Sequence, residues 1–169
     1  TTDIIMVATG TGIAPFRAFL HRLFMEHTTA RQLFQGQAWL ILGVPTTGGL
    51  LYPQEFAAMQ QNAGTILQGG GGGVNGESSS SSQFQVTYAI SREMTNRQGG
   101  KLYVQDVLAE NADVLFEKLE HGAHIYFCGL KGMMPGILTA LEQVATQKKG
   151  LVWADTLSKY KQNNQWHVE

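Results

Sequence analysis

The sequence is poor in cysteine and in charge, and each shortage excludes a class of protein. Its 169 residues contain a single cysteine, Cys128, so an internal disulfide and a paired-cysteine metal or redox motif are both excluded. Charged residues make up only 15% of the chain, and 12 basic side chains are balanced by 13 acidic ones. A nucleic-acid-binding protein needs clustered lysine and arginine, so no nucleic-acid partner is expected.

Long apolar runs and metal-binding spacings are also missing. No stretch approaches the roughly 18 apolar residues of a membrane-spanning helix, so no membrane span is expected. The five histidines are scattered, and none falls in an HExxH or similar pattern, so no metal site is predicted. We interpret His21, His27, His121 and His124 as helix-face or turn residues.

Short apolar segments alternate with helical patterns along the chain. Four of these segments have the continuous hydrophobicity of parallel strands covered on both faces: 4–8, 39–43, 84–90 and 124–128. Apolar residues recur at helical spacing over five further segments: 16–24, 55–59, 104–119, 133–144 and 151–160. This order predicts an α/β fold, in which one domain over 1–169 contains a doubly wound, mainly parallel sheet with helices on both faces.

Residues 64–82 interrupt this pattern with five glycines at 69–73 and five serines at 78–82. Such residues bury almost no apolar surface, so they cannot offset the entropy lost when the backbone is ordered. We interpret 64–82 as a flexible surface insertion between a helix and the third strand. A phosphate-binding glycine loop is the alternative, but such loops place spaced glycines at a turn from a strand to a helix.

The first predicted strand leads into Thr9-Gly10-Thr11-Gly12 and then into a helix with Pro15 in its first turn. Two glycines one residue apart allow a tight turn and a close approach to a ligand, and Thr9 or Thr11 could cap the helix. The N-terminus of a helix favours a pyrophosphate. Because Pro15 replaces the third glycine of the usual dinucleotide pattern, a plain tight turn is the alternative.

Polar side chains follow the third predicted strand. Ser91 and Arg92 come directly after it, and Lys101, Tyr103 and Gln105 lie further along the chain. A hydroxyl, a guanidinium and an ammonium group suit a phosphate monoester, Tyr103 could stack on an adenine, and Gln105 could bond to its edge. A solvated polar turn is the alternative, and the preceding glycine turn makes it the weaker one.

Cys128 ends the fourth predicted strand, and Gly129, Leu130 and Met133 follow it. Ligands of open α/β sheets gather at the carboxyl ends of the strands. A single thiol is more often a small apolar side chain. At this edge, however, a compact thiol could face a flat ring.

Six motifs together resemble the plastid-type ferredoxin–NADP⁺ reductases. In the family's order they are ATGTGIAPFR, LGVPTT with LLY, SRE, KxYVQ, CGLKGM and the terminal WHVE. The resemblance covers nearly the whole chain except the insertion. It implies that residues 1–169 are the C-terminal, Rossmann-like NADP-binding domain of a flavoenzyme. The N-terminal FAD-binding domain of the family is absent from these residues, and so is the aromatic residue that ends the family's chains beyond Glu169.

The resemblance implies a role for each matching residue. Cys128 and Glu169 are implied to act as catalytic residues beside the nicotinamide and the flavin. The residues implied to bind NADP(H) are Thr9, Gly10, Thr11, Gly12, Pro15, Gly43, Val44, Ser91, Arg92, Lys101, Tyr103, Gln105, Gly129, Leu130 and Met133.

The implied activity is electron transfer between ferredoxin and NADP⁺, through hydride exchange between FAD and the nicotinamide. The implied partners are ferredoxin and the FAD-binding domain of the same polypeptide, and the implied location is a plastid, either chloroplast stroma or apicoplast. Without the FAD-binding domain, the chain alone is expected to be inactive. Two alternatives stay open: the NADPH domain of a diflavin reductase, and an NADP-binding module without turnover. The GVPTT segment and the WHVE ending favour the plastid type.

Overall fold

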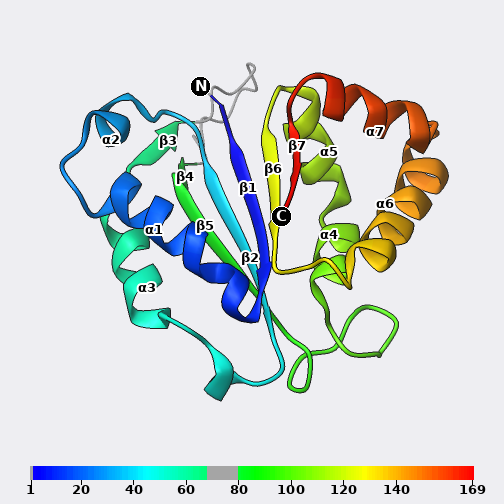
Figure 1. Ribbon diagram of the computed structural model, residues 1–169, viewed down its shortest axis with the longest axis horizontal. Coiled ribbons are helices and arrows are strands. Elements are labelled where there is room, and N and C mark those ends of the chain that lie inside the picture. Colours follow the sequence, from blue (N-terminus) through cyan, green and yellow to red (C-terminus); the bar gives the residue numbers. More distant parts are fainter. Residues whose placement is uncertain (1, 68–79) are drawn as a thin grey trace, which may run out of the picture.

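A parallel sheet lies between two groups of helices in the computed structural model, which describes residues 2–67 and 80–169 (Figure 1). The sheet has the strand order β5-β2-β1-β6-β7, and every neighbouring pair in it is parallel. Its strands are β1 (Ile4–Thr9), β2 (Ala38–Val44), β5 (Phe84–Ile90), β6 (His124–Cys128) and β7 (Trp166–Val168). The predicted α/β fold with a doubly wound, parallel sheet is confirmed.

The central strand β1 is buried on both faces. Ile5 and Val7 pack into the core on one side of the sheet, and Met6 and Ala8 pack into the core on the other side. All four side chains are at most 1% exposed. Because neither face of β1 meets water, its sequence is apolar without alternation.

The helices divide between the two faces of the sheet, as Figure 1 shows. On one face lie α1 (Ile13–Phe24), α2 (Thr29–Leu33) and α3 (Pro53–Asn62). On the other face lie α4 (Val104–Glu110), α5 (Ala112–Glu120), α6 (Met134–Lys149) and α7 (Trp153–Gln162). Within the described ranges, no helix has the length and apolar character that crossing a bilayer requires.

The prediction of one helix over 104–119 is wrong, because the helix is interrupted at Asn111. The backbone of Asn111 leaves the helical conformation, with φ −109° and ψ 23°. Its side-chain amide donates a hydrogen bond of 2.8 Å to the carbonyl of Val107, which satisfies an acceptor at the end of α4. α4 and α5 are therefore separate helices.

The fifth strand, β7, was not predicted from the sequence. It has only three residues and pairs with β6 through Ile125 opposite Trp166 and Phe127 opposite Val168. The buried side-chain amide of Gln165 donates hydrogen bonds to the carbonyls of Leu119 at 2.7 Å and Ala123 at 2.8 Å. These distant partners hold the start of β7 against the end of α5.

The predicted insertion over 64–82 begins and ends in paired backbone. β3 (Thr65–Leu67) and β4 (Ser80–Ser82) form a two-stranded antiparallel sheet. These two short strands were not predicted from the sequence. The glycine run at 69–73 lies outside the described residues, and its flexibility stays a prediction.

Tyr160 on α7 joins the core to a charged group at its edge. Its side chain is fully buried, and its hydroxyl donates a hydrogen bond to Glu120 Oε1 at 3.2 Å. Burial, with the Glu120 carboxylate adding to it, raises the pKa of the Tyr160 phenol well above its ordinary value. Above about pH 10 the unfolded chain therefore loses this proton while the folded chain keeps it, and the free energy of unfolding falls as pH rises.

The variant Tyr160→Phe is expected to lower the free energy of unfolding by about 1 kcal/mol at neutral pH, because one hydrogen bond is lost. It is also expected to weaken the decline in stability above about pH 10. Urea denaturation at neutral and alkaline pH measures both effects, with Tyr103→Phe as the control at an exposed tyrosine. An unchanged alkaline decline in Tyr160→Phe would contradict the assignment.

Candidate functional site

The carboxyl ends of the strands, at the bottom of Figure 1, bring most of the predicted site residues together. Thr9 on β1 pairs with Gly43 on β2, which pairs in turn with Ala89 on β5. The β2–β5 ladder continues past the strand ends, where Ser91 N–H donates to the Val44 carbonyl at 3.0 Å. The residues after β5 are therefore held beside those after β2.

An open pocket of about 340 Å³ lies over the ends of β1, β2 and β5, and we call it the strand-end pocket. Its volume is within the range of small-molecule sites, about 300–1,000 Å³. Seven of the predicted residues line it: Thr9, Gly10, Gly43, Val44, Ser91, Tyr103 and Met133. Pro45, Ala89 and Val104 complete the lining and were not predicted.

The turn after β1 does not use the threonine cap that the sequence predicted. The Thr9 hydroxyl donates a hydrogen bond of 3.1 Å to the carbonyl of Gly129, and the N-cap of α1 is Gly12, which has no side chain. The prediction that Thr9 or Thr11 caps α1 is therefore wrong. The N-cap residue makes no side-chain hydrogen bond at the N-terminus of α1, where the helix dipole favours an anion.

The turns after β1 and β6 pack backbone against backbone. A Cβ on Gly12 would lie only 2.4 Å from the carbonyl oxygen of Cys128. A Cβ on Gly129, which has φ +72°, would lie 3.0 Å from the Cα of Gly12. Only glycine allows this contact at both positions, and the contact places the glycine turn next to Cys128.

Arg92 and Lys101 lie on the exposed chain between β5 and α4, where Lys101 pairs with Thr95 through an isolated bridge. Among the residues that the structure describes, neither cation has a carboxylate within the 4.0 Å of an ion pair, whereas Arg17 is paired with Glu55. Both positive charges are therefore available to an anionic ligand.

Glu93 was not predicted as a site residue, although it follows Arg92 directly. Its Oε1 accepts a hydrogen bond of 3.0 Å from the backbone N–H of Thr47, and its Oε2 accepts one from the Thr47 hydroxyl. These two bonds hold the pKa of the Glu93 carboxyl below its ordinary value, and the bond from the Thr47 hydroxyl contributes more than the bond from the backbone N–H. The sequence signal was the position of Glu93, because a carboxylate directly after Arg92 can pair with that cation unless other groups engage it.

The residues predicted around an adenine lie at different depths. Tyr103 is 39% exposed and lines the strand-end pocket. The side-chain oxygen of Gln105 is buried and has no hydrogen-bond partner in the described part of the chain. Leu130 is 1% exposed and packs in the core cluster that contains Val104, so it lies beneath the site.

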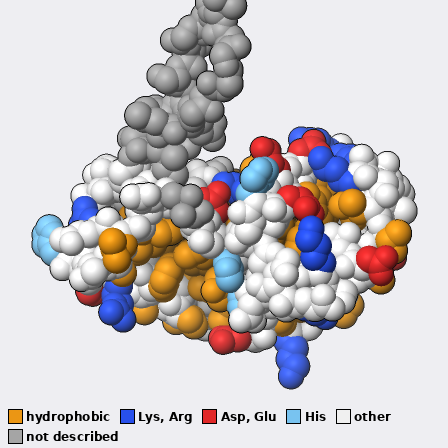
Figure 2. All heavy atoms as spheres, turned by 90° about the horizontal axis from the view of Figure 1, so that it is seen from above, with side chains coloured by type: hydrophobic (Ala, Val, Ile, Leu, Met, Phe, Trp, Pro, Cys, Tyr) orange, Lys and Arg blue, Asp and Glu red, His pale blue; other side chains and the backbone are white. Residues whose placement is uncertain are grey.

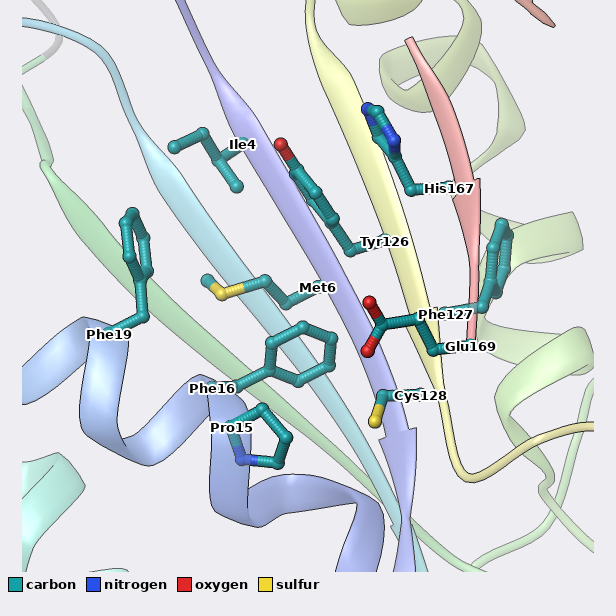
Figure 3. Close-up of a pocket in the computed structure, with 10 residues that line it drawn as sticks. All are labelled: Ile4, Met6, Pro15, Phe16, Phe19, Tyr126, Phe127, Cys128, His167 and Glu169. Carbon is teal, nitrogen blue, oxygen red and sulfur yellow. The ribbon is translucent and has the colours of Figure 1, made fainter. Parts of the chain in front are cut away.

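A second pocket, of about 320 Å³, contains both predicted catalytic residues, and we call it the open-face pocket (Figure 3). Cys128 and Glu169 line it together with Pro15, and Figure 3 shows all three side chains on the α1 side of the sheet. The remaining lining residues are Ile4, Met6, Phe16, Phe19, Tyr126, Phe127 and His167. Ten of the predicted site residues therefore line one of these two pockets. The predicted residues that line neither of the two are Thr11, Gly12, Arg92, Lys101, Gln105, Gly129 and Leu130.

An aromatic cluster adjoins the open-face pocket on β6 and β7. His124 Nδ1 and His167 Nε2 are 3.3 Å apart, and Tyr126 stacks on His167 with ring centroids 4.4 Å apart. The interpretation of His124 as a helix-face or turn residue is wrong, because His124 begins β6. Figure 2 shows hydrophobic side chains gathered beside a histidine on the surface. In the ranges 2–67 and 80–169, no group of three or more His, Cys, Asp or Glu is arranged to hold a metal.

Known proteins are similar in sequence to this chain over almost its whole length. Residues 6–68 and 75–139 match the family model described as "Oxidoreductase NAD-binding domain". The chain is 47% identical over 165 residues to "Ferredoxin--NADP reductase, embryo isozyme, chloroplastic" of Oryza sativa subsp. japonica, and 46% identical to a root-type chloroplastic isozyme of Nicotiana tabacum. It is 42% identical over 167 residues to "Ferredoxin--NADP reductase" of a Picosynechococcus strain. These matches cover 98% of this chain but only 37–39% of the relatives' own length.

The variant Gly12→Ala is expected to lower the free energy of unfolding by about 1–3 kcal/mol, because the new methyl group must displace the backbone of Cys128. The matched control is Gly132→Ala, where nothing lies within 4 Å of the new methyl group, and its expected effect is within about 0.5 kcal/mol. Thermal unfolding of the two variants measures the difference. Equal stabilities would show that the two turns do not pack closely.

Proposed function

The chain belongs to the oxidoreductase NAD-binding domain family, and on that premise we propose that it is the NADP(H)-binding part of a ferredoxin–NADP⁺ reductase. The observation that carries the proposal is the strand-end pocket, where residues from β1, β2 and β5 meet at the carboxyl edge of a parallel sheet. Dinucleotides bind at this edge in open α/β folds. The names of the rice and tobacco relatives supply ferredoxin and NADP⁺ as the substrates.

The 2′-phosphate of NADP(H) is assigned to Ser91, Arg92 and Lys101. Ser91 lines the pocket, and the two cations nearby in the chain have no ion-pair partner in the described ranges. A phosphate monoester offers these donors charge-assisted hydrogen bonds. Because NAD(H) lacks this phosphate, the same three residues account for a preference for NADP(H).

The adenine and the pyrophosphate are assigned to neighbouring parts of the same edge. The exposed ring of Tyr103 offers a stacking surface, and the Gln105 amide can turn toward an adenine without giving up a hydrogen bond to its oxygen. The glycine turn at 10–12 and the uncapped N-terminus of α1 suit the pyrophosphate. Gly43 and Val44 form the pocket floor between them.

The open-face pocket is assigned to the nicotinamide end of the ligand and to a flavin. Its wide apolar lining, with aromatic side chains at its edge, fits one side of a flat ring system. In the proposed reductase, FAD supplies hydride exchange and one-electron transfer. Cys128 and Glu169 would shape the side of the pocket where the rings meet and would orient the nicotinamide.

A flavin-binding domain of the same polypeptide is the proposed partner of this face. Figure 1 shows that α1 and α3 cover one half of the sheet and leave β6 and β7 open on the same side. Tyr126 and His167 are only partly buried there, and Phe19 is 42% exposed. Ferredoxin as electron partner and a plastid location rest on the names of the relatives.

The wild-type chain is expected to bind adenosine 2′,5′-bisphosphate more tightly than it binds 5′-AMP, by a factor of about ten or more. Arg92→Ala and Lys101→Ala are each expected to weaken binding of the bisphosphate by about 1.5–3 kcal/mol, roughly 10- to 100-fold in Kd, and to leave 5′-AMP unchanged. Calorimetric titration measures both ligands, with Lys161→Ala on α7 as the control. Equal affinity of the wild type for the two ligands would overturn the assignment.

Cys128→Ser, made in the full-length flavin-containing protein, is expected to lower turnover much more than affinity for NADP⁺. The physical reason is that a residue beside the reacting rings acts on their geometry and not on the distant phosphate. Steady-state kinetics and a binding titration separate the two effects. Normal turnover in a destabilised protein would mean that Cys128 only packs.

A further inference from the structure

Two loops form the outer part of the strand-end pocket: the β2 loop, residues 45–52, and the β5 loop, residues 91–103. Their backbones are joined where they begin, because Ser91 N–H donates to the Val44 carbonyl at 3.0 Å and Arg92 N–H donates to the Pro45 carbonyl at 2.9 Å. Glu93 then joins the loops again through its side chain. Three consecutive residues of the β5 loop are thus bonded to the last residue of β2 and to the β2 loop.

The bonds of Glu93 replace a missing cap in the β2 loop. Thr47 begins a 3-10 turn, η2 (Thr47–Gly49), and the residue before it, Thr46, makes no side-chain cap hydrogen bond. The free N–H of Thr47 is instead satisfied by Glu93 Oε1 at 3.0 Å, and the Thr47 hydroxyl donates to Glu93 Oε2. A carboxylate at the start of a helical turn is favourable, so Glu93 caps the turn from the neighbouring loop.

The same bonds determine which way the negative charge of Glu93 faces. Glu93 follows Arg92 directly in the chain, so a carboxylate without other partners would be an obvious ion-pair partner for that guanidinium. Both Glu93 oxygens are instead engaged by Thr47, and no ion pair to Arg92 occurs among the described residues. The positive charge of Arg92 therefore stays open to a ligand.

We infer that Glu93 is a positioning residue for the 2′-phosphate of the nucleotide and that it acts through Thr47. Its hydrogen bonds hold the β2 and β5 loops together and engage the carboxylate that would otherwise be free to pair with Arg92. This inference rests on the proposed function, because it concerns the phosphate that Ser91, Arg92 and Lys101 are proposed to bind.

The test uses adenosine 2′,5′-bisphosphate and 5′-AMP as probes in calorimetric titrations. Glu93→Ala is expected to weaken binding of the bisphosphate about tenfold and to leave 5′-AMP unchanged, because the loss falls on the phosphate site. Glu93→Gln is expected to stay within about threefold of the wild type, since its amide can accept from the Thr47 N–H and donate to the Thr47 hydroxyl. Thr47→Val is expected to weaken binding of the bisphosphate severalfold. Thr47→Ser, which keeps the hydroxyl, is expected to bind the bisphosphate about as tightly as the wild type does.

The matched control is Glu110→Ala. Glu110 Oε1 also accepts a backbone N–H from the β5 loop, that of Arg97 at 2.8 Å, but it lies on α4 and does not join the β2 loop. Glu110→Ala is expected to bind both probes as the wild type does. An equal loss in Glu93→Ala and Glu110→Ala would overturn the inference, because loop stability in general would then explain both.

Two further outcomes separate this inference from the proposed function. Equal binding of the two probes by the wild type would overturn the proposed function itself. If the wild type prefers the bisphosphate to 5′-AMP and Glu93→Ala keeps the same preference, only the role of Glu93 is overturned. If Glu93→Ala fails to fold in a thermal unfolding scan, the Thr47→Val and Thr47→Ser pair carries the same test.

Discussion

Burial of the central strand β1 on both faces is the constraint on which the rest of the structure depends. Successive side chains of β1 pack alternately into a core on one face of the sheet and a core on the other face. Helices must therefore cover the sheet from both sides. Parallel strands require crossover helices, and the loops that lead into these helices start at the carboxyl edge. The glycine turn, the β2 loop and the β5 loop therefore meet at one edge.

At that edge, a backbone contact separates two kinds of surface. Gly12 and Gly129 pack directly against each other, and the Thr9 hydroxyl bonds across the same junction. On one side lies the strand-end pocket, to which the adenine and pyrophosphate of the dinucleotide are assigned in the proposed function. On the other side lies the apolar open-face pocket with Cys128 and Glu169. In the proposed reductase, one extended ligand would cross this junction from its anchoring end to its reacting end.

In the proposed function, Arg92 and Lys101 attract the phosphate of the ligand. Arg92 and Lys101 have no ion-pair partner in the described ranges, and the carboxylate nearest to Arg92 in the chain is bonded to Thr47. Among the other cations of the described residues, ion pairs with carboxylates are formed by Arg17, Lys118, Lys149 and Lys159. Lys118, for example, bonds to Asp3 and Gln37, both at 2.8 Å, and ties α5 to the chain near the amino ends of β1 and β2.

Sequence patterns alone predict the order of the four longer strands, most of the helices between them and the kinds of residue at the strand ends. These features are local: continuous apolar runs mark buried strands, the glycine turn and the Ser91–Arg92 pair each directly follow one, and Cys128 ends one. The remaining features follow from the folded structure, because they depend on partners distant in the chain. β7 is a strand because β6 pairs with it and Gln165 finds carbonyls on and after α5. The Thr9 hydroxyl bonds to Gly129 and not to its own helix, since the packing of two glycine turns brings that carbonyl within 3.1 Å. Glu93 binds Thr47, 46 positions away, since the β2–β5 ladder aligns their loops. Patterns within a few residues predict elements, whereas the partner of a hydrogen bond is determined by which elements become neighbours.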